Sequence, residues 1–181
     1  MTATENSTIY SDFPWANIRI VLVETSHPGN IGAVARAMKN MQLGSLYLVN
    51  PRQFPDDHAI ARSSGATDVL DNAKICTSLA GALTGCHYVI AASARKRTVS
   101  WPSLLPEDAA SSLVERCQGT PVALVFGRED SGLTNDEMDH CHAMVKLPTN
   151  PDFSSLNLAA AVQVFSYEIR KAVLAGCFQA G

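Results

Sequence analysis

The stretch IRIVLVETSHPGNIG, residues 18–32, decides the fold class. Its first seven residues form a nearly continuous apolar run, which is typical of a strand buried on both faces. The turn TSHPGN follows, and residues 31–41 predict a helix for which Asn30 is a suitable N-cap. A second apolar run, SLYLV at residues 45–49, completes a strand–helix–strand unit. This order indicates an α/β fold with a parallel sheet.

The rest of the chain continues this alternation. Further strands are expected at residues 87–92, 122–126 and 141–147, and helices at residues 59–63, 78–83, 106–117 and 155–174. The last helix, with Ser154 or Ser155 as its N-cap, carries one apolar face, formed by Leu158, Val162, Phe165, Ile169 and Val173. This face packs either on the sheet alone or on the sheet and a second copy of the chain, and the sequence leaves both open. We therefore predict a parallel sheet covered by helices on both faces.

The composition fits one globular domain. The chain has 181 residues, of which 46% are hydrophobic and 17% charged, which excludes a disordered chain or a coiled coil. No apolar run approaches the length of a membrane span, and the polar start does not resemble a signal peptide, so a cytoplasmic protein is expected. Five scattered cysteines without a CxxC pair, and a lone His140–His142 pair, predict neither a disulfide framework nor a metal site. Residues 1–17 are expected to be a flexible arm, residues 18–175 the domain and residues 176–181 a tail.

The charge is unevenly distributed. The net charge is −3, but residues 36–97 contain eight bases and four acids, a net of +4. A local basic face of this kind binds phosphates, although solvated surface charges give the same pattern. Within it, Arg95, Lys96 and Arg97 follow an expected strand and are the best candidates for phosphate contacts.

Ligands of open parallel sheets bind at the carboxyl ends of the strands, which directs attention to the turns there. Four segments qualify: residues 25–36, 92–97, 127–132 and 147–157. The first lacks both the GxGxxG fingerprint and the P-loop pattern, which argues against a nucleotide-binding oxidoreductase. Arg36 has the planar donor fork that suits a phosphate or an oxyanion, although it can equally be a plain surface charge. Gly127 and Gly132 permit a close approach of backbone to a ligand.

Three of these segments carry a resemblance when they are taken in order. They are Asn30 with Arg36, then LVFGRE at residues 124–129 with GL at 132–133, then LP at 147–148 with SSLNLA at 154–159. Together they resemble the three ordered motifs of the SPOUT superfamily of ribose methyltransferases. HPGNIG at residues 27–32 and ARSSGA at residues 61–66 are similar to a bacterial branch that methylates tRNA. The resemblance covers residues 16–175.

The resemblance implies a fold, a cofactor and partners. The fold would be an α/β parallel sheet with a deep C-terminal trefoil knot, and the protein would be a homodimer joined through the long C-terminal helix and the knot region. The cofactor would be S-adenosylmethionine, and the partner tRNA, methylated on the ribose of C or U at position 32 of the anticodon loop. The branch usually carries a further C-terminal extension that helps to hold tRNA, so the chain is expected to be truncated after its tail.

Matching the motifs residue by residue places the functional positions. Cofactor contacts are implied at Ala92, Ser93, Ala94, Gly127, Leu147, Ser154, Ser155 and Leu156. Catalytic and substrate positions are implied at Arg36, Glu129, Ser155 and Asn157, and RNA contacts are expected at Asn30, Arg36, Arg95, Lys96 and Arg97.

The chemistry constrains these roles. A ribose 2′-hydroxyl is a very weak acid, so the site must position it and stabilise the charge that develops as its proton leaves. Because a guanidinium stays protonated, Arg36 suits oxyanion stabilisation or phosphate binding rather than proton removal. Ser155 and Asn157 would orient the ribose, Glu129 would order its turn or bind substrate, and no metal is required. Two alternatives stay open, a ribosomal RNA methyltransferase of the same fold and a non-catalytic RNA-binding module.

Overall fold

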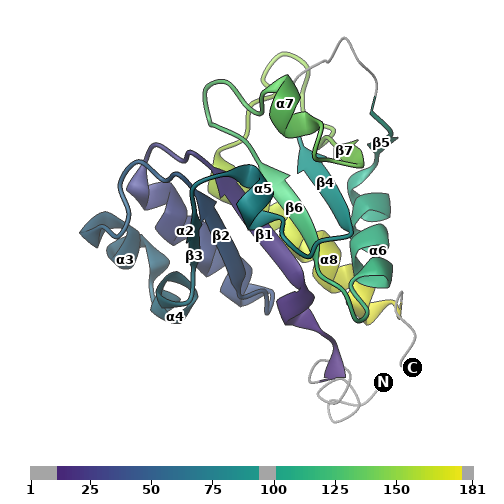
Figure 1. Ribbon diagram of the computed structural model, residues 1–181, viewed down its shortest axis with the longest axis horizontal. Helices are drawn as coiled ribbons and strands as arrows, with labels where there is room; N and C mark the ends of the chain where they lie inside the picture. Colours follow the sequence, from purple (N-terminus) through teal and green to yellow (C-terminus); the bar gives the residue numbers. More distant parts are fainter. Residues whose placement is uncertain (1–11, 94–100, 177–181) are drawn as a thin grey trace.

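The computed structural model describes residues 12–93 and 101–176 (Figure 1). Within these ranges, seven strands form one sheet in the order β3-β2-β1-β6-β4-β7-β5. Every neighbouring pair is parallel. The strands are β1 (Ile18–Val23), β2 (Ser45–Val49), β3 (Lys74–Cys76), β4 (Tyr88–Ala92), β5 (Ser103–Leu104), β6 (Val122–Phe126) and β7 (Ala143–Val145). The predicted parallel α/β sheet is thereby confirmed.

The two short edge strands were not predicted. β3 has three residues and β5 has two, and each pairs on one side only. Ile75 is 58% exposed, so β3 lacks the buried apolar run by which the longer strands are found. These two segments are strands because β3 pairs with β2 and β5 pairs with β7, and not because their own residues form an apolar pattern.

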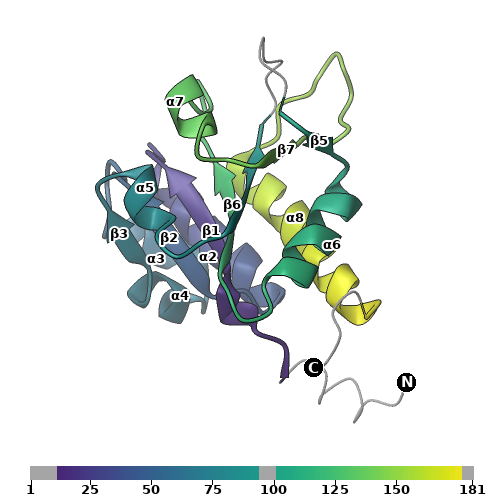
Figure 2. The ribbon, with the colours of Figure 1, turned by 45° about the vertical axis from the view of Figure 1, so that its right-hand side comes forward.

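Helices cover both faces of the sheet. One face carries the larger layer, formed by α2 (Pro28–Asn40), α3 (Asp57–Ser63), α4 (Thr67–Asp71), α6 (Pro106–Arg116) and α8 (Leu158–Leu174). The opposite face is covered by α5 (Leu79–Ala82) and α7 (Asn135–Met138). Figure 2 shows α6 and α8 side by side to the right of the sheet. A hydrophobic core lies on each face of the sheet, and successive side chains of β1 point to opposite faces. Ile20 and Leu22 pack under the larger helical layer, and Val21 and Val23 pack on the opposite face.

The segment before β1 also contributes to the core. A single 3-10 turn, η1 (Trp15–Asn17), leads into β1, and the Phe13 and Trp15 side chains are buried with their rings edge to face at 4.7 Å. Of the expected arm at residues 1–17, this part therefore packs on the domain. None of the helices in the described ranges has the length and apolar character needed to cross a membrane.

The start of α2 differs from the prediction. The helix begins at Pro28, and its N-cap is His27, whose Nδ1 accepts a hydrogen bond from the Gly29 N–H at 3.0 Å. Proline suits the first helical position, because the N–H that it lacks would have no acceptor within the helix and its ring already fixes a helical φ. The helix therefore starts before Asn30. The expectation that Asn30 is the cap is wrong, and its side chain is used elsewhere.

The start of α8 also differs. The N-cap is Asn157, whose Oδ1 accepts a hydrogen bond from the Ala159 N–H at 2.9 Å. Neither Ser154 nor Ser155 caps the helix, which begins at Leu158. Asparagine is among the best capping residues, and its place here removes the anomaly of an Asn in the first helical turn. The apolar face of the helix is buried as expected, from Leu158 to Val173.

Candidate functional site

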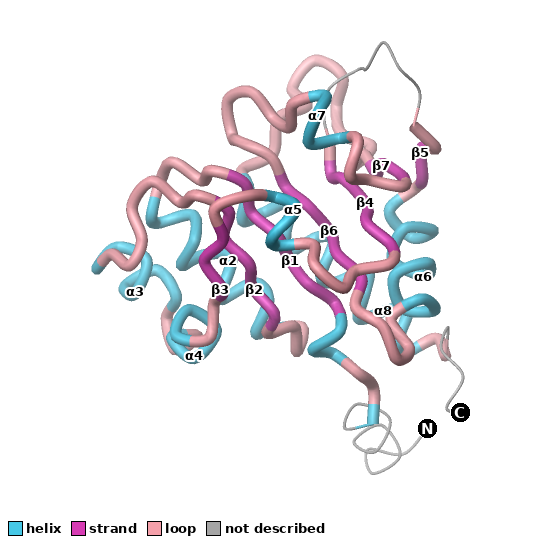
Figure 3. The backbone as a smooth tube through the Cα atoms, viewed as in Figure 1, coloured by secondary structure: helices cyan, strands magenta, loops and turns pink. Residues whose placement is uncertain are grey.

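The strands β1, β6, β4 and β7 end near one another at the carboxyl edge of the sheet (Figure 3). The residues that follow three of these strands line a pocket. Its volume is about 460 Å³, within the range of small-molecule sites. The segments after β4, β6 and β7 and the start of α8 supply most of its wall. Seven of the eight residues expected to hold a cofactor line it, namely Ala92, Ser93, Gly127, Leu147, Ser154, Ser155 and Leu156. The eighth, Ala94, lies outside the described residues.

The pocket combines buried apolar side chains with exposed residues at the start of α8. Phe126 and Phe165 are buried, lie edge to face at 5.8 Å, and line it together with Val145 and Leu147. Ser154, Ser155 and Leu156, which are exposed, also line the pocket. This arrangement suits a ligand that has a flat apolar part and several hydrogen-bonding edges.

Gly127 lets the chain turn sharply at the end of β6. A β-carbon at this position would lie 2.4 Å from the Gly132 carbonyl carbon and 2.6 Å from the Leu133 nitrogen. Real β-carbons are not found so close to backbone, so any side chain would push the loop apart. The loop is closed by reciprocal backbone hydrogen bonds between Arg128 and Gly132, at 2.9 and 3.2 Å, and Gly132 has a φ of +70°.

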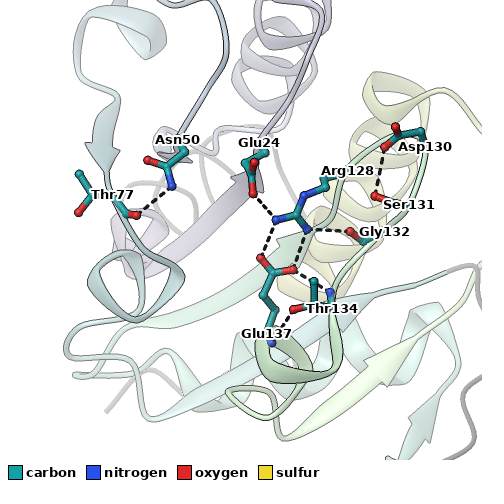
Figure 4. Close-up of polar contacts among 9 residues, drawn as sticks. All are labelled: Glu24, Asn50, Thr77, Arg128, Asp130, Ser131, Gly132, Thr134 and Glu137. Atoms are coloured by element: carbon teal, nitrogen blue, oxygen red, sulfur yellow. Dashed lines mark hydrogen bonds and ion pairs between the residues drawn. The ribbon is translucent and has the colours of Figure 1, made fainter.

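Arg128 ties this loop to two other elements (Figure 4). Its guanidinium donates to Glu24 at the end of β1, to both carboxylate oxygens of Glu137 on α7 at 2.8 and 3.1 Å, and to the Gly132 carbonyl at 3.2 Å. Glu137 also closes a capping box with Thr134 at the start of α7. Because two carboxylates hold the planar guanidinium in one orientation, the loop at residues 127–132, which lines the pocket, is fixed in place.

The network shifts the pKa values of its members. Burial alone would raise the pKa of Glu137, but the hydrogen bonds from Arg128 and the Thr134 N–H outweigh it and hold that pKa below its ordinary value. Hydrogen bonds to Glu137 and Glu24 raise the pKa of Arg128. Both groups are therefore charged at neutral pH, and their role is structural rather than the exchange of protons.

In the wall of the pocket, three predicted residues from three segments form a chain of hydrogen bonds. Glu129 Oε1 accepts from Asn30 Nδ2 at 3.1 Å, and Asn30 Oδ1 accepts from Asn157 Nδ2 at 3.4 Å. The second carboxylate oxygen of Glu129 accepts from the Ser26 N–H and hydroxyl, both at 3.4 Å. We refer to Asn30, Glu129 and Asn157 as the polar chain. It joins the first turn of α2, the loop after β6 and the N-cap of α8.

Arg36 is on the same helix as Asn30 of the polar chain but lies outside the pocket. It lines a second hollow, between α2, α3 and the start of α8, and its side chain is exposed. Six residues of helix place it about 9 Å along α2 from Asn30. Arg95, Lys96 and Arg97 lie outside the described residues, so their expected phosphate contacts stay predictions.

Sequence reasoning missed Glu24 and Glu137, which hold Arg128. Glu24 has a φ of +49°, which is unusual for a residue other than glycine. The neighbouring residues in the sequence do not predict this backbone conformation. Glu137 follows Thr134 by three residues, and this capping-box spacing was a usable signal. In the described part of the chain, no three His, Cys, Asp or Glu side chains are placed to hold a metal ion.

Comparisons with known proteins show which family the chain belongs to. The chain is 57% identical over 159 residues to a tRNA (cytidine/uridine-2′-O-)-methyltransferase TrmJ of Photorhabdus laumondii, and these cover 88% of this chain and 66% of that protein. The chain thus spans just under two thirds of the length of that relative.

Solved structures share the fold. A probable methylase family protein from Haemophilus influenzae Rd KW20 is 46% identical with a TM-score of 0.83, covering 88% of this chain and 67% of that one. TrmJ from Z. mobilis ZM4 is 40% identical with a TM-score of 0.79, covering 85% of this chain and 69% of that one. The model of the SpoU rRNA methylase family matches residues 17–167, which include the pocket, the polar chain and Arg36. The chain therefore belongs to the SpoU rRNA methylase family.

Proposed function

We propose that the chain binds S-adenosylmethionine in the carboxyl-edge pocket and methylates the 2′-hydroxyl of a pyrimidine ribose in tRNA, at position 32 of the anticodon loop. The observation that carries this proposal is the polar chain, which brings three segments distant in sequence together in the wall of a pocket of cofactor size. Family membership and the 57% identity to a curated tRNA ribose methyltransferase support the reaction class.

The residues of the pocket fit S-adenosylmethionine. The sharp turn at Gly127, where a β-carbon would collide with the Gly132 and Leu133 backbone, keeps the loop that forms this part of the pocket wall compact. Peptide groups of Leu147 and of residues 154–156 would hold the polar edges of the adenosine, and Phe126 and Phe165 would face its apolar surface. When bound, S-adenosylmethionine supplies an electrophilic methyl group on a sulfonium centre.

The task left to the chain is to present the ribose oxygen. Asn157, held by its capping bond and by Asn30, would orient the ribose together with Ser155. Glu129 accepts hydrogen bonds from Asn30 and Ser26, so it orders the turn that carries these groups. Arg36 would stabilise the negative charge that develops as the 2′-hydroxyl loses its proton, and it would also attract the adjacent phosphate.

The assembly is part of the proposal. Along α8, Val164, Tyr167 and Leu174 are between 39% and 50% exposed, on the side away from the buried face. An apolar stripe of this kind supports a homodimer joined through α8 and the knot expected in the C-terminal region.

A transfer assay tests the function. The chain is incubated with methyl-labelled S-adenosylmethionine and an unmodified tRNA transcript, and the nucleosides are analysed by mass spectrometry. We expect 2′-O-methylcytidine or 2′-O-methyluridine at position 32, and none in a transcript whose target ribose is a deoxyribose. The family description favours ribosomal RNA as the second candidate. If a ribosomal RNA fragment is methylated and the tRNA transcript is not, that candidate is supported instead. If the chain binds tRNA but transfers no methyl group, a non-catalytic module is supported.

A further inference from the structure

The second hollow has no role in the function proposed so far beyond that of Arg36. Its volume is about 620 Å³, and it lies between α2, α3 and the first turns of α8. Its lining residues are Ala33, Arg36, Ala37, Asn40, Ala61, Arg62, Ser64, Ala159, Ala160 and Gln163. The lining contains two arginines and no acidic residue, so its charge favours an anion.

Arg62 is brought to this hollow by close helix packing. A β-carbon on Gly32 would lie 2.0 Å from the Ala59 carbonyl oxygen, so only glycine lets α3 approach α2 this closely. Arg62 then lies along the N-terminal turn of α2, with its Cγ 3.7 Å from the place of a β-carbon on Gly29. Its aliphatic stem therefore rests on the turn that also carries Asn30.

Neither guanidinium is neutralised by the protein. Within residues 12–93 and 101–176, Arg36 and Arg62 take part in no hydrogen bond or ion pair of their side chains, and both side chains are exposed. Arg128 has two carboxylate partners, by contrast. Two exposed arginines are often no more than solvated charges. These two share one concave surface with no acid in its lining.

The hollow adjoins the proposed active site. Asn30 lines the pocket, and Ala33, one turn further along α2, lines the hollow. On α8, Leu158 lines the pocket, and the two residues that directly follow it, Ala159 and Ala160, line the hollow. The hydrogen bond between Asn30 and Asn157 marks the border between the two.

We propose that Arg62 and Arg36 form a phosphate-binding site in the hollow, and that Arg62 holds the RNA backbone of a nucleotide next to the one methylated. This inference rests on the proposed function for the identity of the nucleotide. The ligand class is a phosphodiester of single-stranded RNA, recognised by charge and by the planar donor fork, without sequence readout.

Binding of RNA as a function of salt tests the site. Two probes are used with the wild-type chain: an unmodified tRNA transcript and a fluorescent 12-nucleotide oligouridylate, followed by anisotropy between 50 and 300 mM KCl. For Arg62→Ala we expect about tenfold weaker binding at low salt, and a plot of log affinity against log salt that is shallower by about 0.7. Arg62→Lys should retain the salt slope and recover part of the affinity. The control is Lys74→Ala, which removes one charge at the amino end of the edge strand β3 and should change neither quantity.

The outcomes separate this proposal from the proposed function. Equal affinities and slopes for wild type and Arg62→Ala, with methyl transfer intact, would overturn the phosphate site and leave the function standing. Binding of oligouridylate that depends on Arg62, in a chain that transfers no methyl group, would support the site and overturn the function. If Arg62→Ala instead changes the molar mass in light scattering while its RNA affinity per protomer is unchanged, the hollow is a contact between copies and the proposal is wrong. Titration with S-adenosylmethionine should give the same affinity for wild type and Arg62→Ala.

Discussion

Asn157 donates a hydrogen bond to Asn30 at 3.4 Å across a separation of 127 residues in sequence. Each of the two side chains has a second partner, since Asn157 caps α8 and Asn30 donates to Glu129. The side chain of Asn157 thus supports both a helix start and the polar chain, and the two roles can be separated by substitution.

Replacement of Asn157 by alanine and by serine is expected to have different effects on stability. Asn157→Ala removes the cap and should lower the free energy of unfolding by about 1 kcal/mol. Asn157→Ser keeps a capping oxygen and should leave stability nearly unchanged, yet it removes the amide that reaches Asn30. Both variants should transfer methyl groups poorly, as measured in the tRNA assay together with urea unfolding. A fully active Asn157→Ser would reduce Asn157 to a capping residue.

Loss of Arg36 should separate binding from transfer. Because Arg36 lies in the hollow and not in the pocket, Arg36→Ala should bind S-adenosylmethionine almost as wild type does. Its turnover should fall roughly 100-fold or more, the usual effect of losing a donor that stabilises developing charge. Arg36→Lys retains the charge without the fork and should recover only part of the rate. Unchanged turnover in Arg36→Ala would contradict its role.

Gly127 and Gly44 form a matched pair for testing the pocket. A β-carbon on Gly127 would meet backbone at 2.4 Å, whereas one on Gly44 would meet nothing within 4 Å. Gly127→Ala should therefore weaken binding of S-adenosylmethionine severely, and Gly44→Ala should not alter it. Calorimetric titration of both variants measures the difference. Wild-type affinity in a folded Gly127→Ala would show that the ligand does not depend on this turn.

The Arg128 network should make stability depend on pH. The folded-state pKa of Glu137 lies below its ordinary value. The stabilisation is therefore complete above the unfolded-state pKa of about 4.3, and is lost as the pH falls through the lower folded-state pKa. Arg128→Ala should cost about 2 kcal/mol at pH 7 and clearly less near pH 3.

Urea unfolding at the two pH values measures this effect. The comparison is Lys171→Ala, which removes an ion pair with Glu168 that is half exposed on the lysine side. Exposed pairs of this kind contribute less than about 1 kcal/mol, so this variant should differ little from wild type at either pH. An Arg128→Ala deficit of the same size at pH 7 and pH 3 would show that the network does not depend on carboxylate charge.

The sequence predicted the long buried strands well because their signal is local. β2 and β6 have the expected bounds, since an apolar run of five residues is visible without any partner. The caps at His27 and Asn157 were assigned to the wrong residues. A capping bond depends on which residue takes non-helical φ and ψ, and at α2 the proline decided this.

The site was predicted in part. The resemblance predicted most residues that line the pocket, because some positions there accept only particular residues. At Gly127, for example, the Gly132 and Leu133 backbone leaves no room for a side chain. The Glu24–Arg128–Glu137 network and the position of Arg62 could not be predicted, since both result from packing between segments far apart in the chain. Glu24 and Arg128 are 104 residues apart, and no periodicity connects them.

Calorimetric titration of the wild-type chain with S-adenosylmethionine, and in parallel with NADH, tests the central claim most directly. The account predicts saturable binding of S-adenosylmethionine with one site per chain, and no binding of NADH, because the turn after β1 lacks the dinucleotide fingerprint. Absence of S-adenosylmethionine binding by a folded chain, with tRNA present and absent, would contradict the assignment of the carboxyl-edge pocket and of the residues around it.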